Sequence, residues 1–192
     1  FETDSGLRHS ELLMEAVDML MRRTGLAKTD LDRVACMGGP GSFTGLRIGF
    51  SAAKGLSLAL SIPLIAVPTL DCIAFSRSSW RGVVLPLIDA KKGAFFTALY
   101  RENERISPYM DAGIDAIFSL LPRDAQILLT GPDAVMIIEE ANFFCPGRVF
   151  LDPSHRRGSA GELLEMAKHI TVNNIDGCSA PLYIRKSDAE KG

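Results

Sequence analysis

The stretch that decides the fold of this chain is Gly38-Gly39-Pro40-Gly41-Ser42-Phe43-Thr44-Gly45-Leu46-Arg47-Ile48-Gly49. It follows the apolar run Val34–Met37, which predicts a short buried strand, and it leads into a segment to Leu60 that predicts a helix. A glycine-rich loop between a strand and a helix brings backbone amides and a helix N-terminus together, which is a ready site for an anion. The same glycines also permit a tight turn and close packing of the helix on a sheet. Both interpretations are open at this point.

The common phosphate-binding and nucleophile templates do not fit this loop. A Walker loop counted from Gly39 would place its second glycine at Thr44, and the next lysine is as far away as Lys54. In the dinucleotide pattern, the third glycine would come one residue too late. Ser42 lacks the glycines two residues to either side that a nucleophile elbow requires, so it has no support as a hydrolase nucleophile.

Composition excludes several classes of protein. The chain has 192 residues, 47% hydrophobic and 23% charged, which is typical of a soluble domain or of two small lobes. The 21 Lys and Arg against 23 Asp and Glu leave a formal charge of −2, which argues against binding nucleic acid through the chain's own electrostatics. The longest uncharged run, residues 55–70, contains Pro63 and Pro68 and does not predict a membrane-spanning helix. The 4 cysteines form no CxxC pair, so we expect reduced thiols in a cytosolic protein.

Strand and helix patterns alternate along the chain, which predicts an α/β class with a mixed sheet. The expected helices are His9–Arg23, Thr44–Leu60, Thr69–Arg77, Asp133–Phe144 and Ser159–Ile170. The expected strands are Val34–Met37, Leu64–Val67, Val83–Ile88, Ala94–Tyr100, Ile127–Leu129 and Val149–Leu151. An Asp89–Gly93 turn would join two of these strands in a hairpin. The chain begins at Phe1 in a polar stretch, so we expect the natural N-terminus to lie upstream.

Further segments, in order, make the pattern specific: Arg8-His9-Ser10-Glu11, Ala53-Lys54-Gly55-Leu56, Ile88-Asp89-Ala90-Lys91-Lys92-Gly93 and Pro181-Leu182-Tyr183-Ile184-Arg185. Together with residues 39–49 they resemble the TsaB (YeaZ) family of bacterial tRNA threonylcarbamoyladenosine biosynthesis proteins. The resemblance runs from about residue 8 to residue 188. Family members normally begin with a β-hairpin carrying an Asp-Thr-Ser-type loop, and this sequence lacks that segment.

The resemblance implies an actin-like (ASKHA, ribonuclease H-like) fold of two lobes, each with a mixed sheet flanked by helices. We place the lobes at residues 1–86 and 87–192. The resemblance also implies a cytoplasmic, non-catalytic scaffold that activates the paralogous enzyme TsaD and works with the ATPase TsaE. That machinery adds threonylcarbamoyl to the adenosine next to the anticodon of tRNAs reading ANN codons, so tRNA would be reached only through the complex. Alone, the protein would form a homodimer.

No catalytic residue, metal site or cofactor is predicted. TsaD binds a metal through a His-x-x-x-His pair, and by resemblance those positions are Thr69 and Ile73 here, neither of which can replace an imidazole. The chain's 3 histidines, His9, His155 and His169, show no ligand spacing. A glycopeptidase-like metalloenzyme is therefore disfavoured.

Two polar features have alternative interpretations. Asp89 could hold Mg²⁺ or a nucleotide, but shaping the Asp89–Gly93 turn is the favoured role. The basic cluster at residues 155–157 is most simply a solvated loop rather than an RNA contact. If a nucleotide binds, as in a rival ASKHA hydrolase or transferase, the candidate contacts are Gly41, Ser42, Thr44 and Gly45. A free-standing RNA-binding module is disfavoured by the charge and by only 1 Trp and 3 Tyr for base stacking.

The helices His9–Arg23 and Thr44–Leu60 are the better candidates for function. By resemblance they form the interface with TsaD, and with a second copy when TsaD is absent. The second helix carries small residues at helical spacing, which lets another helix approach closely. The predicted interface residues are His9, Leu13, Val17, Gly49, Ala53 and Leu56. We expect Ala53→Trp to disrupt association while leaving the fold intact.

Overall fold

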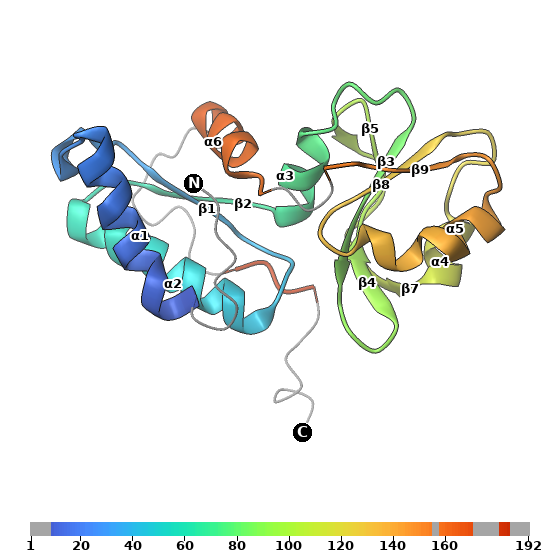
Figure 1. The fold of residues 1–192 in the computed structure, drawn as a ribbon, viewed down its shortest axis with the longest axis horizontal. Coiled ribbons are helices and arrows are strands. Elements are labelled where there is room, and N and C mark those ends of the chain that lie inside the picture. The colour runs from blue at the N-terminus through green and yellow to red at the C-terminus, as the bar shows by residue number, and fades with distance from the viewer. Residues whose placement is uncertain (1–8, 155–157, 171–180, 185–192) are drawn as a thin grey trace.

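The computed structural model describes residues 9–154, 158–170 and 181–184 (Figure 1). The α-helices are α1 (His9–Thr24), α2 (Phe43–Leu60), α3 (Thr69–Phe75), α4 (Ile114–Ser119), α5 (Ile138–Phe144) and α6 (Ala160–His169). The strands are β1 (Val34–Met37), β2 (Leu64–Val67), β3 (Val83–Asp89), β4 (Ala94–Thr97), β5 (Tyr100–Arg101), β6 (Glu104–Arg105), β7 (Met110–Gly113), β8 (Ile127–Thr130) and β9 (Val149–Leu151). Short 3₁₀ helices are η1 (Lys28–Asp30) and η2 (Ala134–Ile137).

The smaller sheet is a parallel pair of β1 and β2, covered by a helix on each face. Because successive side chains of a strand point to opposite faces, each strand contributes to two separate apolar clusters. On one face, α2 supplies the buried Phe50 and Ala53, which pack with Leu64. On the other face, α6 supplies the buried Ala167, which packs with Ile65 and Val67. Figure 1 shows this layering, with β1 and β2 between α6 above and α2 below.

The larger sheet is built around β3. This strand pairs in parallel with β8, which pairs in parallel with β9, and it pairs in antiparallel fashion with β4 and β5. The outer strands β6 and β7 pair with β5 and β4. One face holds the largest cluster of buried side chains, to which β3, β8, α4 and α5 contribute. The predicted α/β class with a mixed sheet is confirmed.

Most predicted elements are confirmed to within a few residues, including the hairpin of β3 and β4. The predicted strand Ala94–Tyr100 is wrong in one respect, because it is divided into β4 and β5. The amide of Leu99 donates to Ser107 Oγ at 2.9 Å, and the Leu99 carbonyl accepts from the Ile106 amide at 2.8 Å, so the chain changes hydrogen-bonding partner there. The predicted helix Asp133–Phe144 is also divided, into η2 and α5.

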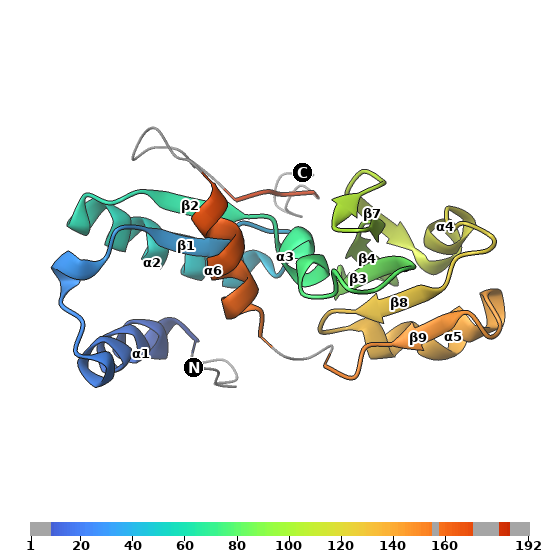
Figure 2. The same cartoon turned by 90° about the horizontal axis from the view of Figure 1, so that it is seen from above.

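The chain passes between the two sheets and later returns. α3 contacts both β3 and α6, so it lies between the halves, as Figures 1 and 2 show. α6 packs on β1 and β2 although it follows every strand of the larger sheet. The division at residues 86 and 87 stays a prediction, but α6 packs with the first sheet rather than with the elements that precede it.

A buried ion pair joins the two connections between the sheets. Arg77, which follows α3, pairs with Asp152, which follows β9, and their side chains are only 17% and 5% exposed. Thr130 Oγ1 donates to the same carboxylate at 2.7 Å, and the Ser154 amide donates at 2.9 Å. Burial opposes ionisation, but the hydrogen bonds from Thr130, Ser154 and Arg77 outweigh it and hold the pKa of Asp152 below its ordinary value.

Within the described ranges, none of the helices combines the length and the apolar character that crossing a membrane requires.

Candidate functional site

The glycine-rich loop connects the end of β1 to the start of α2. Gly39 adopts a φ of +104°, and a Cβ there would lie 2.4 Å from the Leu182 carbonyl oxygen. Glycine is therefore required at this position both for its backbone conformation and for the close approach of the segment 181–184. The Leu182 amide also donates to the Gly38 carbonyl at 2.6 Å. The loop thus holds a segment that is distant in sequence.

The loop is also tied to the start of α3. The Gly39 amide donates to Thr69 Oγ1 at 3.1 Å, and the Thr69 amide donates to the Gly39 carbonyl at 2.7 Å. Ser42 is the N-cap of α2, and its hydroxyl accepts from the Gly45 amide at 3.4 Å. One amide of the helix N-terminus is therefore already satisfied within the loop.

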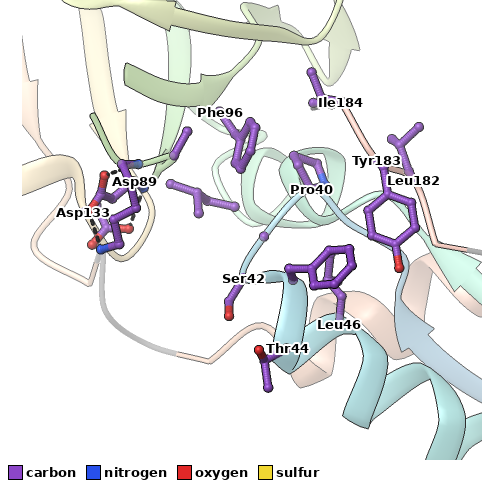
Figure 3. Close-up of a pocket in the computed structure, with 15 residues that line it drawn as sticks. Pro40, Ser42, Thr44, Leu46, Asp89, Phe96, Asp133, Leu182, Tyr183 and Ile184 are labelled. Atoms are coloured by element: carbon purple, nitrogen blue, oxygen red, sulfur yellow. Dashed lines mark hydrogen bonds and ion pairs between the residues drawn. The ribbon is translucent and has the colours of Figure 1, made fainter. Parts of the chain in front are cut away.

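A pocket of about 580 Å³ lies between this loop and the β3–β4 hairpin. Figure 3 shows Asp89 and Asp133 at the left of the pocket, Tyr183 at the right, and Ser42 and Thr44 below and between them. Apolar and aromatic side chains fill much of the remaining wall: Phe43, Leu46, Ile88, Phe96, Leu182 and Ile184. Pockets of this size and mixed lining are typical of small-molecule sites.

The charged residues of the pocket form hydrogen bonds and an ion pair with one another. Asp89 accepts from the Lys91 amide at 2.7 Å and from the Lys91 ammonium at 2.6 Å. The Asp89 amide donates to the Asp133 carboxylate at 2.8 Å. The hydrogen bonds from Lys91 lower the pKa of Asp89, and the same side-chain hydrogen bond raises the pKa of Lys91. These contacts confirm that Asp89 shapes the hairpin turn.

The lining residues suit a negatively charged ligand poorly. Two carboxylates, Asp89 and Asp133, face the pocket, and Lys91 is the basic residue among those that line it. Within the described ranges, no group of three or more His, Cys, Asp or Glu side chains is arranged to hold a metal ion. A triphosphate would meet a lining with more negative than positive groups, which is unfavourable without a bound cation.

The predicted nucleotide contacts are only partly brought together. Gly41, Ser42 and Thr44 line the pocket, whereas Gly45 does not and its amide is bonded to Ser42. Asp133, Phe96 and the segment 182–184 also line the pocket, and nothing in the sequence pattern predicts their contribution. The motif that contains Tyr183 carries the family resemblance, but its local pattern does not indicate that it reaches the pocket.

The segment 181–184 is held against α2 by its aromatic ring. Tyr183 lies with its ring centroid 5.5 Å from that of Phe43 in the first turn of α2. The guanidinium of Arg47 lies 3.9 Å from the centroid of the same Phe43 ring, in a cation–π contact. Tyr183 and Arg47 therefore support the side chain that forms one wall of the pocket.

The two positions that the resemblance aligns with a histidine pair have structural roles in this chain. Thr69 accepts a hydrogen bond from the glycine-rich loop and is 9% exposed, while Ile73 is a core residue that is 7% exposed. Their side chains thus secure the loop and fill the interior.

The predicted interface residues fall into three groups. Leu13 and Val17 on α1, and Gly49 and Leu56 on α2, are half-buried, and the two helices contact each other. The prediction that Ala53 faces a partner is wrong, because this residue is 6% exposed and packs with Phe50 in the core beneath α2. A tryptophan at Ala53 would therefore disrupt the fold.

The remaining interface and loop predictions fall outside the part that can be described. The backbone of His9 belongs to α1, but its side chain is outside the described residues, as are His155, Arg156 and Arg157. His169 is exposed on α6, where it lies 3.4 Å from Glu165.

Apolar side chains on the outer surfaces of α1 and α2 remain exposed. Met14 is 45% exposed, Leu20 is 38% exposed and Leu58 is 58% exposed. No side chain between residues 12 and 24 of α1 is fully buried, although this helix has a clear apolar face. Figure 1 shows α1 running alongside α2 at one end of the molecule. Leu20 and Leu58 are further interface candidates, which the sequence pattern alone does not indicate.

Comparisons with known proteins agree on one family. Residues 4–141 match the family model described as TsaD, tRNA N6-adenosine threonylcarbamoyltransferase. The tRNA threonylcarbamoyladenosine biosynthesis protein TsaB of Bacillus subtilis is 29% identical over 188 residues, covering 95% of this chain and 82% of that protein. The protein of the same name from Escherichia coli is 38% identical over 100 residues, covering 50% of this chain and 42% of that protein.

Solved structures show the same fold. A structure described as an uncharacterized protein with similarity to peptidase YEAZ from Pseudomonas aeruginosa superposes with a TM-score of 0.74 at 24% identity, covering 92% of this chain and 84% of that one. A structure of YeaZ from Pseudomonas aeruginosa gives a TM-score of 0.68 at 25% identity, covering 86% of this chain and 79% of that one. These likenesses confirm the arrangement of mixed sheets flanked by helices.

Proposed function

Because the chain belongs to the TsaB (YeaZ) family, within the wider family of the threonylcarbamoyltransferase TsaD, we propose that it is a non-catalytic subunit of the tRNA threonylcarbamoylation machinery. It forms a heterodimer with TsaD and activates that enzyme, which places threonylcarbamoyl on the adenosine next to the anticodon of tRNAs reading ANN codons. The protein works in the cytoplasm, and TsaE joins the assembly. The two halves of the fold correspond to actin-like lobes.

The observation that carries this proposal is the outer surface of the α1–α2 pair, here called the α1–α2 face, on which Leu20 is 38% and Leu58 is 58% exposed. The predicted interface residues Leu13, Val17, Gly49 and Leu56 are half-buried, and Leu58 points to a different side of α2 from Leu56. A helix whose apolar face is left partly in water has not completed its packing within the monomer. Small residues on α2 permit a close approach, and exposed leucines supply area to bury. The face therefore suits a helical partner surface.

The chemistry of the pocket supports an accessory role. At the two positions where TsaD carries metal-binding histidines, Thr69 and Ile73 hold the loop and the core in place. Asp89 and Asp133, the carboxylates of the pocket, are used to shape the β3–β4 hairpin and its neighbour. The formal net charge of −2 supports contact with tRNA through the complex rather than directly.

A nucleotide-dependent enzyme is the alternative, and the pocket is the observation that favours it. Gly41, Ser42 and Thr44 place backbone and hydroxyl groups at the N-terminus of α2 beside an aromatic wall. Under this alternative, the purified protein turns over ATP by itself, and changing Gly41 abolishes that turnover. Absence of turnover, with TsaD activation intact, decides for the accessory role.

The experiment is a mixing series with the cognate TsaD, followed by size-exclusion chromatography with light scattering. We expect a one-to-one complex that forms at the expense of the homodimer. Leu58→Lys, at a 58% exposed position on α2, should abolish the complex without unfolding the protein. Leu164→Lys on α6 is the matched control, because that leucine is 53% exposed outside the α1–α2 face. No complex at any ratio would refute the proposal, and a complex that Leu58→Lys leaves intact would refute the assigned face.

A further inference from the structure

The end of the molecule opposite α1 carries a second apolar surface, which the proposed function does not use (Figure 1). We define the α5 patch as Phe143 and Phe144 at the end of α5. Their exposed fractions are 84% and 44%. A phenylalanine that is 84% exposed is costly in water, and exposed aromatic clusters of this kind mark interaction sites.

The aromatic rings of the α5 patch are held in place from below. Phe118 of α4 is 7% exposed and belongs to the core of the larger sheet. Its ring stacks on that of Phe144, with centroids 5.4 Å apart and an interplanar angle of 8°. Phe143 meets Phe144 edge to face, with centroids 5.8 Å apart. A ring that is already positioned loses little conformational freedom when a partner covers it, so Phe143 is well suited to anchor a contact.

The charges on α5 beside Phe143 are negative, whereas Arg148, which follows the helix, donates hydrogen bonds from its guanidinium to the carbonyls of Pro122 and Ala125. Glu139 and Glu140 precede Phe143 by four and three residues on the same helix, and both are exposed. Residues at these spacings share a helix face. Neither glutamate forms an ion pair or a hydrogen bond with another residue of the described part of the chain. The patch therefore combines an aromatic anchor with two available carboxylates.

This charge decides which kind of partner fits. Phosphates of a nucleic acid and anionic lipid headgroups would both be repelled by Glu139 and Glu140. A second copy related by a two-fold axis through α5 would place the same carboxylates opposite each other. A protein segment with lysine or arginine beside apolar side chains meets both features at once.

We propose that the α5 patch docks a basic, amphipathic segment of a partner protein. Apolar side chains of that segment cover Phe143 and Phe144, while its cationic side chains pair with Glu139 and Glu140. The α5 patch and the α1–α2 face lie at opposite ends of the molecule in Figure 1, so both are available to partners at the same time.

Peptide binding, measured by fluorescence anisotropy with the full chain, tests this proposal. The probe is a helical peptide with leucine on one face and lysine beside it, and its counterpart carries glutamate at every lysine position. We expect the lysine peptide alone to bind. Phe143→Ser should weaken that binding at least tenfold, and the double variant Glu139→Lys, Glu140→Lys should reverse the preference between the two peptides. Leu164→Ser, on α6, should leave binding unchanged.

Several results would overturn the proposal. These are equal binding of both peptides, binding that Phe143→Ser does not weaken, and absence of binding by either peptide up to about 1 mM, the weak limit of specific association. Binding of tRNA or of anionic vesicles that is lost in Phe143→Ser would assign the patch to a different class of partner. Circular dichroism of each variant confirms its fold, which substitutions at exposed positions should preserve.

Discussion

Replacing Asp152 with asparagine tests how the two halves of the molecule are joined. The substitution keeps the size of the side chain but removes the charge that pairs with Arg77. Arg77 follows α3 and Asp152 follows β9, so the pair links the two segments that connect the smaller sheet with the larger one. In the variant, the Arg77 side chain, which is only 17% exposed, is left without its carboxylate partner.

The expected loss of stability follows from the burial of this pair. Removing one partner of a buried, hydrogen-bonded ion pair costs about 3–5 kcal/mol, because the remaining charge is left uncompensated. For a domain of this size each kcal/mol lowers the melting temperature by roughly 2–4 °C, so we expect a decrease of about 6–20 °C. The hydrogen bond from Thr130, at 2.7 Å in the native protein, should also weaken when its acceptor loses its charge.

The loss should depend on pH with a definite sign. The pKa of Asp152 is lower in the folded protein than its ordinary value. The stabilisation is therefore fully present above the unfolded carboxyl pKa of about 3.9 and is lost as the pH falls through the folded pKa. Differential scanning calorimetry of both proteins from neutral pH downward should show a constant difference in melting temperature, which narrows only below about pH 4.

Asp18→Asn is the matched control. Asp18 pairs with Arg22 on the surface of α1, where the side chains are 56% and 79% exposed. An exposed pair contributes little, so its loss should change the free energy of unfolding by less than about 1 kcal/mol. If Asp152→Asn is as mild as Asp18→Asn, or if its effect is the same at pH 7 and below pH 4, the role assigned to this pair is wrong.

Two further predictions concern the loop and the core. Gly39→Ala should lower the free energy of unfolding, measured by urea denaturation, by about 1–3 kcal/mol, because residue 39 adopts a φ of +104°. Gly55→Ala on α2, where a Cβ would meet open space, should instead raise it by about 0.5–1 kcal/mol. Equal effects of the two substitutions would contradict the backbone constraint at Gly39. Burial, with nearby carboxylates, raises the pKa of Cys72 to about 12, so iodoacetamide at pH 8 should label this thiol only after unfolding; rapid labelling in the native protein would contradict its burial.

The sequence predicted most of the fold because its regular elements bury periodic apolar faces. α2 and β1 are examples: each has a strong local pattern, and the glycine-rich loop between them was correctly placed. The elements that were missed, β6, β7 and α4, are short and depend on partners elsewhere in the chain. Local patterns carry little information about such segments.

Only the part of the candidate site that is formed by neighbouring residues in the sequence was predicted. Ser42 and Thr44 belong to the glycine-rich loop, whereas Asp133 and Tyr183 reach the pocket through the tertiary fold. The ion pair of Arg77 with Asp152 joins residues 75 positions apart and has no local signature. Ala53 illustrates a different limit: small residues at helical spacing indicate close packing, but they do not tell whether the partner is the protein's own sheet or another molecule.

Reconstituted tRNA modification tests the central proposal most directly. The assay combines cognate TsaD, TsaE, threonylcarbamoyl-adenylate and tRNA with the full-length protein, its Leu58→Lys variant or its Asp89→Asn variant. We predict that TsaD activity requires this protein, that Leu58→Lys reduces it at least tenfold, and that Asp89→Asn preserves it. Full activity of TsaD without this protein, or loss of activity in Asp89→Asn while the complex still forms, would contradict a non-catalytic role through the α1–α2 face.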